Sequence, residues 1–314
     1  MPDVLSTVLP VFGIILGGFL TAHFRLLPEG TGKGLADFVF GIAMPALLFR
    51  TMATVGTSGV PALGLLFGFF IANALVWLLT TVITLRVLRR PLADAPAICM
   101  GACFGNTVML GLPLGTAHFG EKGAAAIAVI VAMHAPVLWI AATIQQEWSL
   151  HEGKVDLAAK LRSLTYDLLT NPVVFGVLAG SLWRTTGLGI AEIPDRMISL
   201  IGQAGIPGSL FALGMSLTLF EVKTGARALV AITMLKLLVM PLTAWVISHH
   251  VLGLPPLGVG VVTLLAACPT GANAFLFASR YERAVGSVSG AVAIGTALSI
   301  ISISALLLAL GPPA

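Results

Sequence analysis

Hydrophobic residues occur along this chain in long runs that short polar stretches separate. Ten of these runs are about 20 residues long, which is the length that an α-helix needs to cross the hydrocarbon core of a bilayer. The pattern predicts an all-α polytopic membrane protein. Its ten predicted transmembrane helices lie at residues 4–22, 35–54, 60–85, 96–117, 123–144, 167–183, 197–219, 227–248, 257–279 and 286–310.

Two of the ten runs carry helix-breaking residues near their centres. The fourth run contains Asn106 between Gly105 and Pro113, and the ninth contains Pro269 and Asn273. Proline removes a backbone donor, so these helices should be interrupted there. Interrupted backbone at membrane depth is tolerated only where it is buried in protein or lines a wet cavity. Two such interruptions in corresponding segments are typical of the substrate site of a secondary transporter.

The longest polar stretch, residues 145–166, is rich in charged residues and is predicted to be an aqueous linker. It divides the chain into a first unit, 1–144, and a second unit, 167–314, with five predicted helices each. Because five is an odd number, the two units enter the membrane in opposite directions and form an inverted repeat. Similar residues recur at similar offsets: Pro10 and Pro172 (162), Pro45 and Pro207 (162), and Asn106 and Asn273 (167).

Composition agrees with a membrane protein. Of the 314 residues, 57% are hydrophobic and 10% are charged, with a mean hydropathy of +1.01, whereas a soluble domain carries about 25% charged residues. If the N-terminus is outside, twelve of the 17 basic residues lie on the inner side and four on the outer side, while Lys236 lies within a helix. This asymmetry predicts that both termini are outside. The first run follows no basic residue and is predicted to be an uncleaved membrane segment.

The basic residues are scattered over short loops without interleaved aromatic residues, so we expect no nucleic-acid partner. Cys99, Cys103 and Cys268 all lie in hydrophobic runs, where cysteine packs as a small apolar residue. Without suitably spaced histidines they predict no metal site, and we expect no cofactor. The chain also contains no His-x-x-x-His, paired aspartates or Gly-x-Ser-x-Gly, so we expect no enzyme.

Five segments together resemble the auxin efflux carrier family, in the bacterial branch that is similar to malonate and malate permeases. They are LPVFGIILGGFL, LADFVFGIAMPALLFR, GNTVMLGLPLG, NPVVFGVLAG and CPTGANAFLFAS. The resemblance covers essentially the whole chain, without the long central loop of many plant members, and is most specific at residues 106–113 and 269–273.

The resemblance implies a fold and an activity. The fold would be two inverted five-helix repeats in which broken helices 4 and 9 cross. Helices 1, 2, 6 and 7 would form a scaffold that mediates a homodimer, while helices 3–5 and 8–10 would form a moving transport domain. The activity would be elevator-type transport of small organic anions, and the bacterial branch implies the cell inner membrane.

The interruptions supply most of the candidate substrate-binding residues. Each second half-helix presents free amides and the positive end of its dipole, which suit an anion. Asn106 and Asn273 can both donate and accept hydrogen bonds, although the same side chains could instead stabilise the broken backbone. The remaining candidates in these two segments are Thr107, Pro113, Pro269 and Thr270.

Lys236 is the most unusual single residue. A lysine at the centre of a transmembrane helix costs about 2.5–3.5 kcal/mol, and no carboxylate lies deep in a predicted helix to pair with it. We therefore predict that the anionic substrate supplies the counter-charge. The alternatives are a proton carrier or a structural residue that donates to a carbonyl. Asn73 lies 163 positions earlier and is its candidate counterpart in the first repeat.

His134, beside Pro136 in the fifth predicted helix, is a second candidate for proton coupling, with helix packing as the alternative. The leading functional hypothesis is a secondary active transporter or uniporter of small mono- or dicarboxylates, including auxin-like acids. One alternative is a sodium- or proton-coupled antiporter or symporter of similar architecture for another solute. The other is a membrane sensor that transports nothing.

Overall fold

The computed structural model of the protein describes residues 2–54, 59–150, 170–220 and 225–310. Within these ranges the chain is helical, and its only β-type pairing is one isolated bridge. The helices are α1 (Pro2–His23), α2 (Thr31–Phe38), η1 (Val39–Ala43), α3 (Met44–Thr54), α4 (Ala62–Arg86), η2 (Leu92–Asp94), α5 (Ala95–Cys103), η3 (Thr107–Gly111), α6 (Leu112–Leu150), α8 (Pro172–Thr185), α9 (Glu192–Ser216), η4 (Leu217–Leu219), α10 (Ala226–Met234), η5 (Leu235–Val239), α11 (Met240–Val246), η6 (Ile247–Val251), α12 (Pro256–Ala267), α13 (Ala272–Arg280) and α14 (Val285–Leu310).

The described residues confirm a polytopic membrane protein. Six helical segments are long and apolar enough to cross a bilayer: Thr31–Thr54, Ala62–Arg86, Thr107–Ser149, Glu192–Leu219, Ala226–Val251 and Val285–Leu310. The other apolar helices in the described part are shorter, and two of them, Leu92–Cys103 and Pro256–Ala267, end at the interruptions. Large side chains on α4, such as Phe67 and Leu78, are exposed, as expected for a helix that faces lipid.

Helix α6 runs through the predicted connection between the fourth and fifth helices and extends past the predicted end of the fifth helix at residue 144. Gly120 has φ 65° and ψ −160° and bends the chain between the fourth and fifth predicted helices. At its C-terminal end α6 continues to Leu150, past the predicted linker start at residue 145. Gln145 accepts a hydrogen bond from Trp77 Nε1 (2.8 Å) and donates one to Thr81 Oγ1 (3.1 Å). Packing against α4 therefore extends the helix, and the rest of the predicted linker lies outside the described residues.

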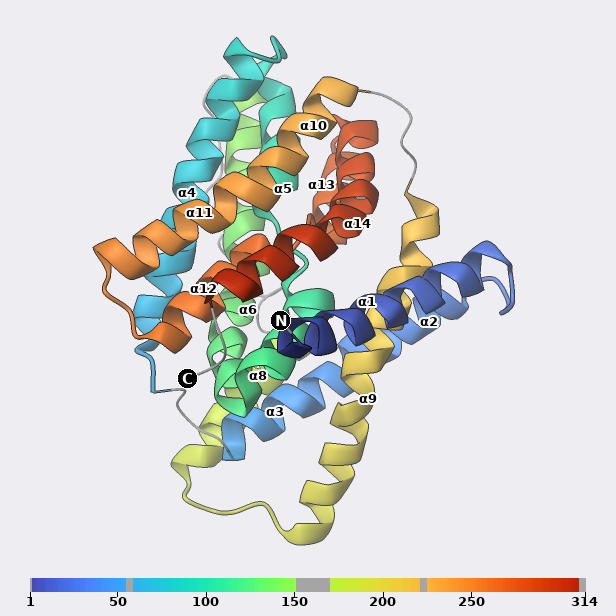
Figure 1. Ribbon diagram of the computed structural model, residues 1–314, viewed down its shortest axis with the longest axis vertical. Coiled ribbons are helices and arrows are strands. Elements are labelled where there is room, and N and C mark those ends of the chain that lie inside the picture. Colours follow the sequence, from blue (N-terminus) through green and yellow to red (C-terminus); the bar gives the residue numbers. More distant parts are fainter. Residues whose placement is uncertain (1, 55–58, 151–169, 221–224, 311–314) are drawn as a thin grey trace.

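The helices form two groups that share α6 (Figure 1). In one group α9 packs along α1, α2 and α3, and α3 also packs along α8. In the other group α4 packs on α5 and α11, and α10 packs on α14. Helix α6 contacts members of both groups, so it links them.

Glycines permit two equivalent close contacts within the first group. A Cβ atom on Gly18 of α1 would collide with the carbonyl oxygen of Phe211 in α9. In the same way, a Cβ atom on Gly180 of α8 would collide with the carbonyl oxygen of Phe49 in α3. Gly18 and Gly180 are 162 residues apart, as are Phe49 and Phe211. The same small-residue contact, which lets transmembrane helices approach closely, therefore occurs twice.

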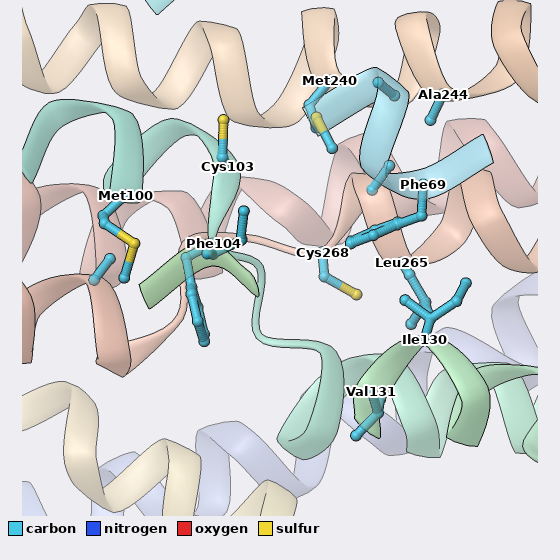
Figure 2. Packing of buried hydrophobic residues seen from close by; sticks show 14 of the residues in the cluster. Phe69, Met100, Cys103, Phe104, Ile130, Val131, Met240, Ala244, Leu265 and Cys268 are labelled. Atoms are coloured by element: carbon cyan, nitrogen blue, oxygen red, sulfur yellow. The ribbon is translucent and has the colours of Figure 1, made fainter. Parts of the chain in front are cut away.

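The hydrophobic core surrounds the interruptions. Figure 2 shows Cys103 and Phe104 at the end of α5 and Leu265 and Cys268 at the end of α12. They belong to one cluster of buried residues that also contains Phe69 and Met240. The broken backbone is thus enclosed by protein, as interrupted helices in a membrane require.

Candidate functional site

The two interrupted helices meet at their breaks. Helix α5 ends at Cys103 and η3 begins at Thr107, while α12 ends at Ala267 and α13 begins at Ala272. The Asn106 amide donates to the Pro269 carbonyl oxygen (2.8 Å), and the Gly271 amide donates to the Phe104 carbonyl oxygen (2.9 Å). These bonds form the antiparallel bridge between Gly105 and Thr270. Each break therefore satisfies backbone groups of the other.

Two side chains bind carbonyl groups at the ends of the first half-helices. Thr270 Oγ1 donates to the carbonyl oxygen of Gly101 in α5 (2.8 Å). Lys236 Nζ donates to the carbonyl oxygen of Ala266 in α12 (2.8 Å). The last carbonyls of a helix have no amide partner within that helix, so both side chains supply donors that the interruption removes.

A cavity of about 540 Å³ lies beside the crossing. Its walls come from both helix groups: the breaks, α2, η1, the middle of α6 and the start of α8. The polar side chains among its lining residues are Asp37, Asn106, Thr107, His134, Asn171 and Asn273. Phe104 and Val131 are among the apolar ones. A mostly apolar cavity of this size with a few polar groups is typical of a small-molecule site.

The cavity brings together half of the residues that the sequence singled out. Asn106, Thr107, Asn273 and His134 line it. The other four candidates, which are buried but absent from its lining, are Pro113, Pro269, Thr270 and Lys236. Hydrogen bonds explain two of these placements, because Thr270 and Lys236 are turned toward backbone carbonyls.

Three helices of the described part begin at this cavity, and two of them are capped by an asparagine. Asn106 Oδ1 accepts a hydrogen bond from the Met109 amide (3.2 Å) at the start of η3. Asn171 Oδ1 accepts from the amides of Val173 (2.9 Å) and Val174 (3.3 Å) at the start of α8. Both arrangements satisfy amides that a helix start leaves free.

The third helix start, that of α13, has no side-chain cap. Its N-cap residue is Gly271, which has no side chain to accept a hydrogen bond. Asn273, in the first turn of α13, lines the cavity and is only partly buried. Its side chain makes no hydrogen bond with the described residues. The start of α13 is therefore where the cavity offers unmet donors.

His134 packs tightly in the cavity wall. Its side chain is 2% exposed, and its ring lies 4.3 Å from the Phe104 ring and 5.5 Å from the Phe69 ring between centroids. His134 Nδ1 and Thr107 Oγ1 are 3.1 Å apart, within hydrogen-bonding distance. This contact fixes the ring against the second half of the first broken helix.

Sequence reasoning missed Asn171 and Phe104. Asn171 is followed by Pro172, and an asparagine before a proline is a helix-start signal. The cap of α8 could therefore have been predicted from the sequence. Its place at the cavity depends on how α8 packs against the distant breaks. The position of Phe104 at the cavity could not be predicted, because nothing distinguishes one phenylalanine from the other residues of a hydrophobic run.

A second cavity, of about 520 Å³, is lined by Arg50, Thr54, Phe119, Glu121 and Lys122. Arg50 Nε and Nη2 donate to the carboxylate of Asp195 at 2.8 and 3.0 Å. Asp37 and Arg50 lie thirteen residues apart in the segment Thr31–Thr54, about 20 Å at 1.5 Å per residue. The two cavities therefore lie toward opposite ends of this segment.

These features define a polytopic membrane protein with a largely apolar cavity, which carries a few polar side chains, at two interrupted helices. The family described as membrane transport protein matches residues 3–307, and the chain belongs to it. This is the auxin efflux carrier family that the sequence motifs predicted. The chain is accordingly a membrane transport protein and not a member of an enzyme family.

Several relatives align with nearly the whole chain. "Putative malonate transporter" of Rhizobium meliloti is 24% identical over 98% of this chain and 96% of its own length. "Auxin efflux carrier component 8" of Arabidopsis thaliana is 22% identical over 95% of this chain and 94% of its own length. "Lysosomal cholesterol signaling protein" of Mus musculus is 26% identical over 96% of this chain but only 37% of its own length.

Proposed function

We propose that the protein moves small organic anions across the membrane as a secondary active transporter or a uniporter. The anions are mono- or dicarboxylates, with auxin-like acids included, and they bind where the interrupted helices cross. One observation carries this proposal: of the three helix starts at the cavity, only that of α13 lacks a side-chain cap. The names of the malonate and auxin relatives support the same class of substrate.

The chemistry of the α13 start suits a carboxylate. Free amides at a helix start point outward along the axis, and the helix dipole adds positive potential there. A carboxylate would accept hydrogen bonds from these amides and from the side-chain amide of Asn273. Phe104 and Val131 would contact the apolar part of the anion. No lysine or arginine is among the described residues that line this cavity, so dipoles and amides supply the attraction.

Transport requires the site to open alternately to the two sides, and we propose an elevator motion. The scaffold is helices 1, 2, 6 and 7 of the predicted ten, and the transport domain is helices 3–5 and 8–10. The glycine contacts of Gly18 and Gly180, which recur at an offset of 162, support a rigid scaffold and an inverted repeat. Asp37 and Asn171 of the scaffold side line the cavity with Asn106 and Asn273, so relative motion would change its access.

We place the protein in the cell inner membrane with both termini outside, following the distribution of basic residues. In this orientation the cavity faces the cytoplasm, because Asn171 lies close to the predicted inner linker. We also propose a homodimer through the scaffold. On α9, Gln203 Nε2 donates to Ser199 Oγ (3.0 Å) at an exposed position, and polar side chains on a transmembrane surface favour helix association.

Proton coupling, if uptake depends on pH, is assigned to His134. Among the described residues that line the cavity, Asp37 and His134 are the two with ionisable side chains. His134 lies against the break through Thr107, whereas Asp37 is exposed. Substitution of His134 by glutamine should then remove the response of uptake to an imposed pH gradient.

A second candidate function is a sensor that binds a ligand without transporting it. The similarity to a protein named lysosomal cholesterol signaling protein favours this alternative. The two functions differ in one measurable quantity, which is solute flux across a sealed bilayer.

Uptake into proteoliposomes tests the proposal. Labelled malonate, malate and indole acetate are offered under imposed pH, sodium and potential gradients to wild type and to Asn273→Ala. Glu29→Ala, a substitution at an exposed position between α1 and α2 and outside the cavity lining, is the control. We expect saturable uptake that falls at least tenfold in Asn273→Ala and stays unchanged in the control. Ligand binding without flux under any gradient, from folded protein, would instead establish the sensor.

A further inference from the structure

Lys236 is completely buried and does not line the cavity. The residue belongs to η5, its exposed fraction is 0%, and it is absent from the cavity lining. Its ammonium group donates to the carbonyl oxygen of Ala266 at 2.8 Å, the one hydrogen bond it makes with the described residues. A lysine at this depth is expensive to bury, so its contacts should account for its presence.

The ammonium group sits at the crossing itself. A Cβ atom built on Gly105 would lie 3.2 Å from Lys236 Nζ and 3.3 Å from the carbonyl oxygen of Leu265. Gly105 is the bridge residue of the first break, and Ala266 is in the last turn of α12. The ammonium therefore lies against both interrupted segments. The end of α12 carries the negative pole of its dipole, which a nearby cation stabilises.

The first half of the chain has a contact at the matching position but no cation there. Cys103 Sγ donates to the carbonyl oxygen of Asn73 at 3.7 Å. Asn73 and Lys236 are 163 residues apart, and so are Cys103 and Ala266. The side-chain amide of Asn73 donates to the Phe69 carbonyl oxygen within its own helix. The hydrogen bond from a cation is thus made to the second break, which is also the break with the uncapped helix start.

We propose that Lys236 is a positioning residue that holds the end of α12 without contacting the transported anion. Residues 268–271 connect Ala267 to the first residue of α13, so a fixed end of α12 also fixes the amides at the start of α13. The functional part of this inference rests on the anion site proposed above. The structural part concerns the protein without substrate.

Hydrogen exchange tests the structural part in ligand-free protein reconstituted in nanodiscs. The readout is exchange of the Asn106 and Gly271 amides, which form the bridge between the breaks. In Lys236→Met we expect exchange of these amides to accelerate at least tenfold. Thr233→Val is the matched control, because Thr233 is buried one turn earlier in the same segment and its hydroxyl has no hydrogen-bond partner among the described residues. Exchange in this control should match wild type.

Transport kinetics test the functional part. For each of malonate, malate and indole acetate that wild type carries, Lys236→Met should lower uptake by the same factor, because the positioned amides serve every carboxylate. Lys236→Arg keeps the charge and should recover most of the activity. A loss of affinity that is much greater for the dianions than for indole acetate would overturn the proposal and make Lys236 the substrate's counter-charge.

Gly105→Ala provides a second route should Lys236→Met fail to fold. The new methyl group would lie 3.2 Å from the ammonium and 3.3 Å from the Leu265 carbonyl oxygen, so the ammonium would have to shift by a few tenths of an ångström. Exchange at Asn106 and Gly271 should again accelerate. Unchanged exchange at both amides in either folded variant would overturn the inference. If wild type carries no carboxylate, the proposed function fails, while the exchange result still decides the role of Lys236.

Discussion

The two interruptions share a backbone arrangement and differ in their side chains. Each contributes one amide and one carbonyl to the bridge between Gly105 and Thr270. The first continues into a helix whose start is capped by Asn106, and the second continues into a helix that starts at Gly271 without a cap. The same backbone geometry therefore leads into one capped helix start, that of η3, and one uncapped helix start, that of α13.

The difference assigns unlike roles to the two breaks. A side-chain cap stabilises a helix by about 0.5–2 kcal/mol, so η3 gains stability that α13 forgoes. An unmet donor in a poorly hydrated site is costly until a partner arrives. The start of α13 can therefore gain more from an anion than the start of η3 can. The hydrogen bond from Lys236 to the end of α12 would hold this break in place while the amides at the start of α13 remain free.

Gly271→Val should produce the largest effect. The new side chain would crowd the Gly105 carbonyl oxygen, which lies 3.1 Å from the Cβ position, and the Phe104 ring at 3.2 Å. The bridge would open and the start of α13 would shift, so we expect uptake to fall at least about 100-fold, as misplaced binding groups typically cause. Gly189→Val, at an exposed glycine with open space around it, is the control. Wild-type uptake by Gly271→Val would show that the bridge does not organise the site.

Asn273→Ala should have the next largest effect, and it should act on affinity alone. A hydrogen bond to a charged group is worth about 1.5–3 kcal/mol, so the dissociation constant for the carboxylate should rise roughly 10- to 150-fold. The melting temperature should not change, because the Asn273 side chain makes no hydrogen bond with described residues. Equilibrium binding and thermal unfolding of the same preparation measure both quantities. A variant with a lower melting temperature and wild-type affinity would show that Asn273 stabilises the fold and does not bind the anion.

Asn106→Ala should act mainly on stability. Loss of its cap on the Met109 amide should lower the free energy of unfolding by about 1 kcal/mol. Its effect on affinity should be smaller than that of Asn273→Ala, because its side-chain oxygen is already engaged. Asn106→Asp keeps an acceptor at the cap and should recover the lost stability. The comparison fails if Asn106→Ala weakens anion binding more than Asn273→Ala does.

Asn171→Ala should have the smallest effect of the series. It removes the cap of α8 at a partly buried position, where water can replace it, so the loss should be about 0.5–1 kcal/mol. The dissociation constant of the anion should stay within about threefold of wild type, since the affected amides belong to a capped start. Thermal unfolding and binding titration check this together. A larger loss of affinity would place the anion at α8 instead of α13.

Much of the fold could be predicted because local signals were strong. Hydrophobic runs of spanning length indicated a membrane protein, and glycine and proline marked both interruptions. Helices α5 and α12 end at Cys103 and Ala267, within a few residues of those signals. The extension of α6 beyond residue 145 was missed because polar residues there pack against Trp77 and Thr81 of a distant helix.

The site could be predicted only in part. Asn106 and Asn273 were identified because they sit in the breaks, but their unlike roles depend on which amides their side chains reach in space. Lys236 was recognised as costly, and its bond to Ala266 could not be inferred from residues 30 positions apart. Asn171 and His134 reach the cavity through tertiary packing, on which sequence spacing carries no information.

A crystal structure with a brominated carboxylate would test the central claim most directly. Crystals grown from lipidic mesophase would be soaked with bromomalonate or bromoacetate, and the anomalous signal would locate the bromine atom. The account predicts one peak in the cavity, with the carboxylate within hydrogen-bonding distance of the amides at the start of α13 and of Asn273. A carboxylate beside Lys236, or in the cavity lined by Arg50 and Lys122, would contradict it.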